Sequence, residues 1–127
     1  MAAELETLDP GELARAHGGV QMKLTQFGYP HDPYSDSETR KGHGAYRHLA
    51  GDTSLALTDS ALKALGLTRS GVTHTPTWVD IHLKGGGTMH RRIDDRAPER
   101  DKRADLYMVH GFDRHLPDRA DITLSGR

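Results

Sequence analysis

The sequence contains no cysteine, which excludes disulfide bonds and thiolate metal sites within the chain. Its 17 basic and 18 acidic side chains give a formal net charge of −1, so no basic excess favours binding to nucleic-acid phosphates. No apolar run approaches the ~20 residues that a membrane-spanning helix requires. We therefore expect no nucleic-acid partner and no membrane span. A length of 127 residues corresponds to one domain.

Valine and isoleucine are also scarce, with seven residues in total, although eleven threonines supply further β-branched side chains. The charged residues are unevenly distributed among types: 13 Asp against 5 Glu, and 12 Arg against 5 Lys. Short carboxylates and rigid guanidinium groups favour turns and fixed ion pairs over long, flexible surface charges.

Residues 1–19 are predicted to form an N-terminal helical extension. Asp9 is the expected N-cap, Pro10 the first helical residue and Glu12 the partner in a capping box, with Gly18 closing the helix. Acidic residues stand where a secretory signal would be basic, and no apolar stretch follows. The localisation is therefore left open: periplasm or cell wall if a signal has been removed, and otherwise delivery by a phage or a secretion system.

From residue 20, apolar and polar residues alternate up to about Phe27, which predicts a half-buried strand. A polar loop rich in glycine and proline follows over residues 28–53, and loops of this length are usually functional or mobile. Further strands are predicted at 55–57, 78–83, 89–93, 105–109 and 121–124, with the glycines at 85–87 turning a hairpin. A second short helix is expected over 60–65, capped by Thr58 or Asp59 and closed by Gly66. Six short strands and two short helices predict a small, mainly β barrel or sandwich over residues 20–127.

The densest polar cluster covers residues 91–96 and continues at 103–105. Asp94 and Asp95 are predicted to lie where a strand passes into a loop. Because adjacent carboxylates point in different directions, one can face a cleft with a raised pKa while Arg92, Arg96 or Arg103 holds the other ionised. The alternative from these residues alone is a turn cap with surface ion pairs.

The run Arg-Ile-Asp-Asp-Arg-Ala-Pro at 92–98, followed by Arg-Ala-Asp-Leu at 103–106, resembles the signature of the rare lipoprotein A family of double-psi β-barrels. In that family arginine-isoleucine-asparagine-aspartate-arginine-glycine-proline precedes an isoleucine-aspartate-leucine segment. Segments 25–29, 55–58, 65–66 and 79–83 are similar to the wider group, which includes the three-aspartate domains of membrane-bound lytic transglycosylase A and the barrel of expansins. The resemblance covers residues 20–110 and implies a six-stranded double-psi β-barrel. Thr58 and Asp59 stand where the families carry a catalytic histidine or aspartate.

Members of this group bind or cleave peptidoglycan or plant-wall glycans, so the resemblance implies a polysaccharide partner and lytic transglycosylase chemistry. It implies that Asp95 protonates the glycosidic oxygen and then assists attack by the sugar's own 6-hydroxyl, with Asp105 orienting or tuning this acid. Asp94 is a further candidate for tuning the same acid. Such a reaction can proceed with one carboxylic acid, whereas hydrolysis usually needs two carboxylates about 5 to 9.5 Å apart. Aromatic side chains suit a glycan groove because sugar faces pack on rings. The residues predicted to bind substrate are Thr25, Tyr29, Asp36, Tyr46, Trp78 and Arg96.

Other functions are open at this point. The chain can be a non-catalytic module that binds peptidoglycan, or a structural part of a phage or secretion apparatus. A cytoplasmic toxin or an unrelated small barrel enzyme is a third class. Asp36, His43 and His48 are conceivable metal ligands, but their spacing matches no metal-binding motif, so we expect neither a metal nor a cofactor.

Overall fold

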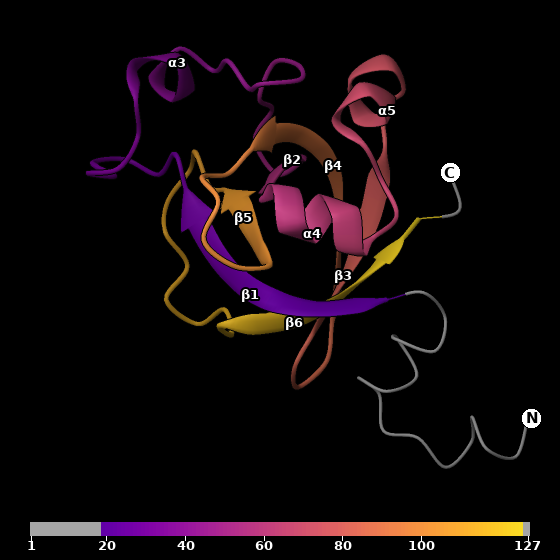
Figure 1. Cartoon of the computed structure of the whole chain (residues 1–127). Coiled ribbons are helices and arrows are strands. Elements are labelled where there is room, and N and C mark those ends of the chain that lie inside the picture. The colour runs from indigo at the N-terminus through magenta and orange to yellow at the C-terminus, as the bar shows by residue number, and fades with distance from the viewer. Residues whose placement is uncertain (1–18, 126–127) are drawn as a thin grey trace, which may run out of the picture.

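The computed structural model of the chain describes residues 19–125, and the predicted N-terminal helix lies outside this range. The chain is mainly β, as predicted, with three short helices among the described residues (Figure 1). None of the helices in that range is long and apolar enough to cross a membrane. In chain order the elements are β1 Val20–Phe27, α3 Ser37–Arg40, β2 Ser54–Leu57, α4 Asp59–Ala64, α5 Arg69–His74, β3 Trp78–Leu83, β4 Thr88–Arg96, β5 Arg103–Tyr107 and β6 Arg119–Leu124.

The six strands close into a barrel in the order β1-β5-β2-β4-β3-β6. β1 pairs in parallel with β5, and β2 pairs in parallel with β4, while the other four pairings are antiparallel. Closure leaves no exposed strand edge. This mixed pairing is compatible with the double-psi barrel that the resemblance implies.

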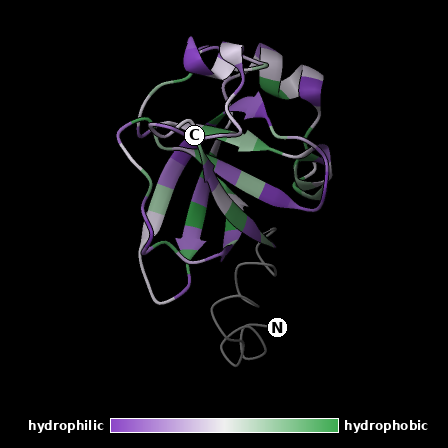
Figure 2. Ribbon diagram, turned by 90° about the vertical axis from the view of Figure 1, so that its left-hand side faces the viewer, coloured by the Kyte–Doolittle hydropathy of each residue, from purple (hydrophilic) through white to green (hydrophobic). Residues whose placement is uncertain are grey.

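The barrel interior is filled by the apolar residues of the alternating strands, and the alternation is visible along the ribbons in Figure 2. Met22 and Leu24 of β1 are buried, whereas the intervening Lys23 is exposed. The helices that follow β2 add to the same core, with Leu62 from α4 and Val72 from α5. The alternation of apolar and polar residues in the sequence therefore identifies the side chains that face the barrel interior.

Several strand and helix predictions differ from the structure, including β4, which ends at Arg96 instead of residue 93, and α3, which lies within the predicted loop. β5 begins at Arg103, two residues earlier than predicted, because Arg103 already pairs with Lys23 of β1. Leu124 shares the face of the buried Ile122 but is 45% exposed at the end of β6. Helix α5 was not predicted, since residues 69–74 are poor in strong helix formers, and Thr68 starts it by accepting a hydrogen bond from the Gly71 amide at 3.0 Å.

The loop over residues 28–53 is held in shape by Asp32, which is only 5% exposed. Its carboxylate accepts hydrogen bonds from Gly28 N at 2.9 Å, Tyr34 N at 3.0 Å and Ser35 Oγ at 2.9 Å. Gly28 has φ +71°, and a Cβ there would lie 2.4 Å from the Tyr107 ring. The chain therefore leaves β1 through a position that only glycine can occupy.

Candidate functional site

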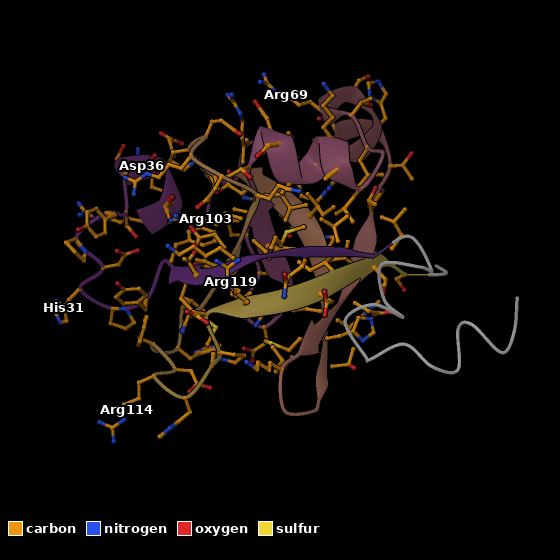
Figure 3. The ribbon with its side chains drawn as sticks, turned by 60° about the horizontal axis from the view of Figure 1, so that its bottom comes forward. His31, Asp36, Arg69, Arg103, Arg114 and Arg119 are labelled. Atoms are coloured by element: carbon orange, nitrogen blue, oxygen red, sulfur yellow. The ribbon has the colours of Figure 1, made fainter. Side chains whose placement is uncertain are left out.

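A cleft of about 860 Å³ lies between the barrel and two of its connections, the 28–53 loop and the β4–β5 loop. Asp36, before α3, and Arg103, at the start of β5, lie on the same side of the molecule and both line this cleft (Figure 3). Its lining also includes Thr25, Gln26, Phe27, Tyr29, Asp32, Tyr34, Ser35, Glu38, Thr39, His43, Gly44, Ala45, Ala56, Asp95, Arg96, Ala97, Pro98, Arg100 and Asp105.

Four of the residues that line the cleft form a row across four neighbouring strands. In the strand register Thr25 of β1 lies opposite Asp105 of β5, and Asp105 lies opposite Ala56 of β2. Ala56 in turn lies opposite Asp95 of β4. The strand pairing therefore brings Asp95 and Asp105 into one cleft, on either side of the small Ala56 side chain.

A β-bulge in β4 decides which of the two adjacent aspartates faces the cleft. Leu55 of β2 pairs with Ile93, but the next residue, Ala56, pairs with Asp95, so Asp94 is the extra residue. The sequence predicted that both aspartates follow the end of the strand; β4 instead continues to Arg96. Because a bulge shifts the alternation of side chains by one residue, Asp95 takes the outward position that Asp94 would otherwise occupy.

Asp94 is fully buried and holds the bulge in place. Its carboxylate accepts hydrogen bonds from Arg92 Nε at 2.6 Å and Arg92 Nη2 at 3.0 Å, and also from the Ser54 hydroxyl. Arg47 Nη1 lies 3.6 Å from Asp94 Oδ1. The Asp94 carbonyl accepts from the amides of Tyr46 and Arg47 at 3.0 and 3.2 Å. The bulge is thus fixed through both the side chain and the backbone of Asp94.

The Asp95 carboxyl faces the cleft and is anchored through one oxygen. Its Oδ1 accepts from Ala45 N at 2.7 Å and from Arg96 N at 2.8 Å, whereas Oδ2 has no hydrogen-bond partner within residues 19–125. Burial raises the pKa of Asp95, the two amide hydrogen bonds lower it, and the negative charge of Asp36 raises it again, with a net increase. Asp95 therefore has one carboxyl oxygen without a hydrogen bond among the described residues, and its carboxyl is harder to ionise than usual.

Asp105 has the more strongly perturbed carboxyl. Burial raises its pKa from the ordinary 3.8 to about 6, against the opposing effects of the Thr25 hydrogen bond and the Arg103 charge. Thr25 Oγ1 donates to Asp105 Oδ1 at 2.9 Å. A carboxyl with such a pKa holds its proton well above the pH at which an exposed aspartate loses it.

Of the predicted substrate-binding residues, Thr25, Tyr29, Asp36 and Arg96 line the cleft. Tyr29 packs edge-on against Phe112, with ring centroids 5.1 Å apart. Asp36 is the N-cap of α3 and accepts from Thr39 N at 2.8 Å, and this bond lowers the pKa of its carboxyl. The cleft therefore collects four of the six side chains predicted to bind substrate.

Tyr46 and Trp78 are not part of the cleft. Tyr46 packs against the hydrophobic core, and its hydroxyl is buried without a hydrogen-bond partner among the described residues. Trp78 stacks on His90 of β4, with ring centroids 4.6 Å apart and an interplanar angle of 7°. Ring type alone led to both predictions, and the fold directs these rings elsewhere.

The Thr58–Asp59 pair has structural roles. Thr58 is fully buried, caps α4, and donates to Asp101 O at 2.6 Å. Asp59 is held by two guanidinium groups: Arg96 Nη2 donates to it at 2.7 Å, and Arg69 forms a second ion pair. These ion pairs lower the pKa of Asp59. Neither residue lines the cleft, so the position that is catalytic in the resembling families contributes no reactive group to it.

Two further features near the site have weak sequence signals. Arg47 donates to Ile93 O at 2.8 Å and to Val72 O at 2.7 Å, which joins the long loop to β4 and α5. Glu38 and His43 form a hydrogen-bonded pair at the cleft, with Oε2 and Nδ1 2.8 Å apart. Their spacing of five residues matches no motif, so only the fold reveals the pairing. Within residues 19–125, no three histidine or carboxylate side chains gather closely enough to hold a metal ion.

Comparison of the chain with protein-family models and with curated proteins found no match. The barrel and the chemistry of the cleft are therefore the basis for assigning a function.

Proposed function

We propose that this protein cleaves a cell-wall glycan, with peptidoglycan as the expected substrate, by general acid catalysis from the Asp95–Asp105 pair. The observation that supports this proposal is the shared cleft, in which both carboxyls have raised pKa values. Glycosidic bonds are commonly cleaved by a protonated carboxyl acting beside a second carboxylate. The resemblance of segment 92–106 to rare lipoprotein A and three-aspartate domains supports the same substrate class.

The two carboxyls differ in environment, and this difference supports separate roles. The resemblance gives the proton to Asp95, but Asp105 has the pKa of about 6 and so carries a proton closer to neutral pH. Asp95 accepts two backbone amide hydrogen bonds, which favour its ionised form. We therefore propose Asp105 as the acid that protonates the glycosidic oxygen. Asp95 then stabilises the positive charge that develops at the sugar C1.

The spacing of the strands leaves room for a sugar between these groups. Asp95 and Asp105 flank Ala56, so their backbones are two strand spacings, or about 10 Å, apart. Attack on C1 by the sugar's own 6-hydroxyl would release a 1,6-anhydro product without a bound water nucleophile. Tyr29, Asp36 and Arg96 on the cleft walls can contact the ring hydroxyls and faces of the sugar.

Mass spectrometry of purified peptidoglycan incubated with the protein tests the proposal. The wild type should release 1,6-anhydro-muropeptides, and Asp105→Asn and Asp95→Asn should each lower the initial rate about 100-fold or more. Asp80→Asn is the matched control, since Asp80 pairs with His90 away from the cleft and its variant should keep the wild-type rate. Products with ordinary reducing ends would replace this mechanism by hydrolysis, and no product from the wild type would refute the enzyme proposal.

A second candidate is a peptidoglycan-binding module without catalysis, acting alone or within a phage or secretion apparatus. The structural roles of Thr58 and Asp59 favour it, as do the exposed rings of Tyr34 and Phe112, which are 89% and 56% accessible. In that case, sedimentation with insoluble peptidoglycan should persist in Asp105→Asn while no product forms. Absence of both binding and cleavage would exclude this candidate as well.

A further inference from the structure

The Glu38–His43 pair places a proton acceptor on the wall of the same cleft. The two residues line it together with Asp95 and Asp105, and Oε2 of Glu38 lies 2.8 Å from Nδ1 of His43. Both side chains are open to solvent, with 60% and 46% of their surface accessible. A carboxylate at Nδ1 fixes the proton on that nitrogen and leaves Nε2 with a free lone pair, as in other carboxylate–histidine pairs.

The backbone of the 28–53 loop connects His43 to Asp95, one of the row of four residues that line the cleft. The amide of His43 donates to Glu38 O at 2.8 Å, and residue 43 forms an isolated antiparallel bridge with residue 48. Two residues after His43, the amide of Ala45 donates to Asp95 Oδ1 at 2.7 Å. Because each residue advances the chain by no more than about 3.8 Å, the Cα atoms of His43 and Ala45 are within roughly 8 Å of each other. The imidazole and the Asp95 carboxyl therefore belong to the same region of the cleft.

The loop that carries His43 is packed directly on the bulge. A Cβ added at Gly44 would lie 2.5 Å from the Asp94 carbonyl oxygen and 2.7 Å from the Arg47 carbonyl oxygen. These are backbone atoms, which cannot move aside as a flexible side chain can. The same contact therefore holds the bulge and the residue beside His43 at a fixed separation.

We infer that His43, oriented by Glu38, is the base that removes the proton from the attacking 6-hydroxyl of the sugar. This inference depends on the proposed glycan cleavage. In the step, the C1–oxygen bond to the leaving sugar breaks and a C1–O6 bond forms. The Asp105 proton passes to the leaving oxygen, and the O6 proton passes to Nε2 of His43. Return of that proton to Asp105 through solvent restores the starting state, so no other reactant is needed.

The inference gives Glu38 and His43 different roles. His43 contacts the reacting hydroxyl and is a catalytic residue, whereas Glu38 acts through it and is a positioning residue. Loss of a general base typically lowers the rate about 100-fold or more, and loss of its orienting partner lowers it less. His48 is a matched control, because its ring packs edge-on against His43, with centroids 5.1 Å apart, but does not line the cleft.

The experiment measures kcat and KM on soluble peptidoglycan fragments for the wild type and four variants. His43→Gln, which can still donate to Glu38, should lower kcat about 100-fold or more while KM changes less than threefold. Added imidazole should restore a measurable part of the activity of His43→Ala. Glu38→Gln should lower kcat about tenfold with little change in KM. His48→Asn should retain the wild-type kcat.

The outcomes distinguish a failure of the His43 role from a failure of the proposed glycan cleavage. If the wild type is active, and Asp105→Asn is not, an unchanged kcat in His43→Gln overturns the inference and leaves Asp105 to accept the 6-hydroxyl proton itself. A loss of activity in His43→Ala that imidazole does not restore also overturns it, because the ring then only supports the loop. An inactive wild type overturns the proposed function, and this inference with it.

Discussion

Replacing Asp105 by Asn should stabilise the fold at alkaline pH, because the carboxylate of Asp105 is costly to ionise in the cleft. Burial raises its pKa from 3.8 to about 6, so the folded state binds this proton more tightly than the unfolded chain does. Stability from this group is complete below about pH 4 and is lost as the pH rises through about 6. The Asn variant has no such titration, and its carbonyl can still accept from the Thr25 hydroxyl.

The difference between 3.8 and about 6 corresponds to about 3 kcal/mol of unfolding free energy. Roughly half of this loss, about 1.4 kcal/mol, falls between pH 5 and pH 8, because the unfolded aspartate is already mostly ionised at pH 5. With ordinary urea m-values of about 1–3 kcal/mol/M, the urea midpoint should change by about 0.5–1.4 M more in the wild type than in the variant.

The assay is urea unfolding of the wild type and Asp105→Asn at pH 5 and pH 8, followed by circular dichroism. Taking the change with pH in each protein, and then the difference between proteins, cancels the contributions of all other titrating groups. Asp80→Asn provides the control for removal of a negative charge outside the cleft. Equal pH dependence of wild type and Asp105→Asn would show that the Asp105 carboxyl is not desolvated, and the argument for an acid in the cleft would fail.

Three further substitutions test the contacts that hold the cleft carboxyls and the bulge in place. Thr25→Val removes a hydrogen bond that lowers the pKa of Asp105, so the fall in kcat with rising pH should move upward by several tenths of a pH unit. Asp94→Asn leaves two arginines without their buried carboxylate and should cost about 2–3 kcal/mol in urea unfolding. Gly44→Ala should cost about 1–3 kcal/mol and reduce glycan cleavage, because its Cβ would meet backbone oxygens. Gly86→Ala is the control, because its Cβ would meet no atom within 4 Å. It should lose stability only through its φ of +114° and should leave cleavage intact. Equal losses of activity in both glycine variants would contradict the role of packing at Gly44.

The strands were predictable because each depends on a local pattern. Alternating apolar residues in β1 and β3 gave the bounds of these strands, and the three glycines between β3 and β4 gave the start of β4 within one residue. Helix α5 escaped prediction because Thr68 starts it without a run of strong helix formers to continue it. Tertiary contacts, including the burial of Val72 in the core, stabilise that helix instead.

The sequence predicted the acidic character of the site, but only some of the predicted residues line the cleft. The clustering of Asp94, Asp95 and Asp105 among arginines marked one segment as reactive, and Asp95 and Asp105 do share the cleft. Tyr46 and Trp78 are also aromatic residues in polar surroundings, yet one packs on the core and the other on His90. The type of a residue does not determine where its side chain points. That direction depends on the strand register and on contacts between residues distant in sequence.

The sequence alone therefore determined the strands of the barrel, its hairpin, and the short acidic and basic segment that holds two of the cleft carboxyls, because periodicity and clustering are properties of neighbouring residues. Only the tertiary structure decided that Asp95 rather than Asp94 faces the cleft, since the bulge depends on pairing between β2 and β4. The same is true of the Thr25–Asp105 hydrogen bond, which joins residues 80 positions apart. The raised pKa of Asp105 also required the fold, because burial is a property of the assembled barrel and not of any segment.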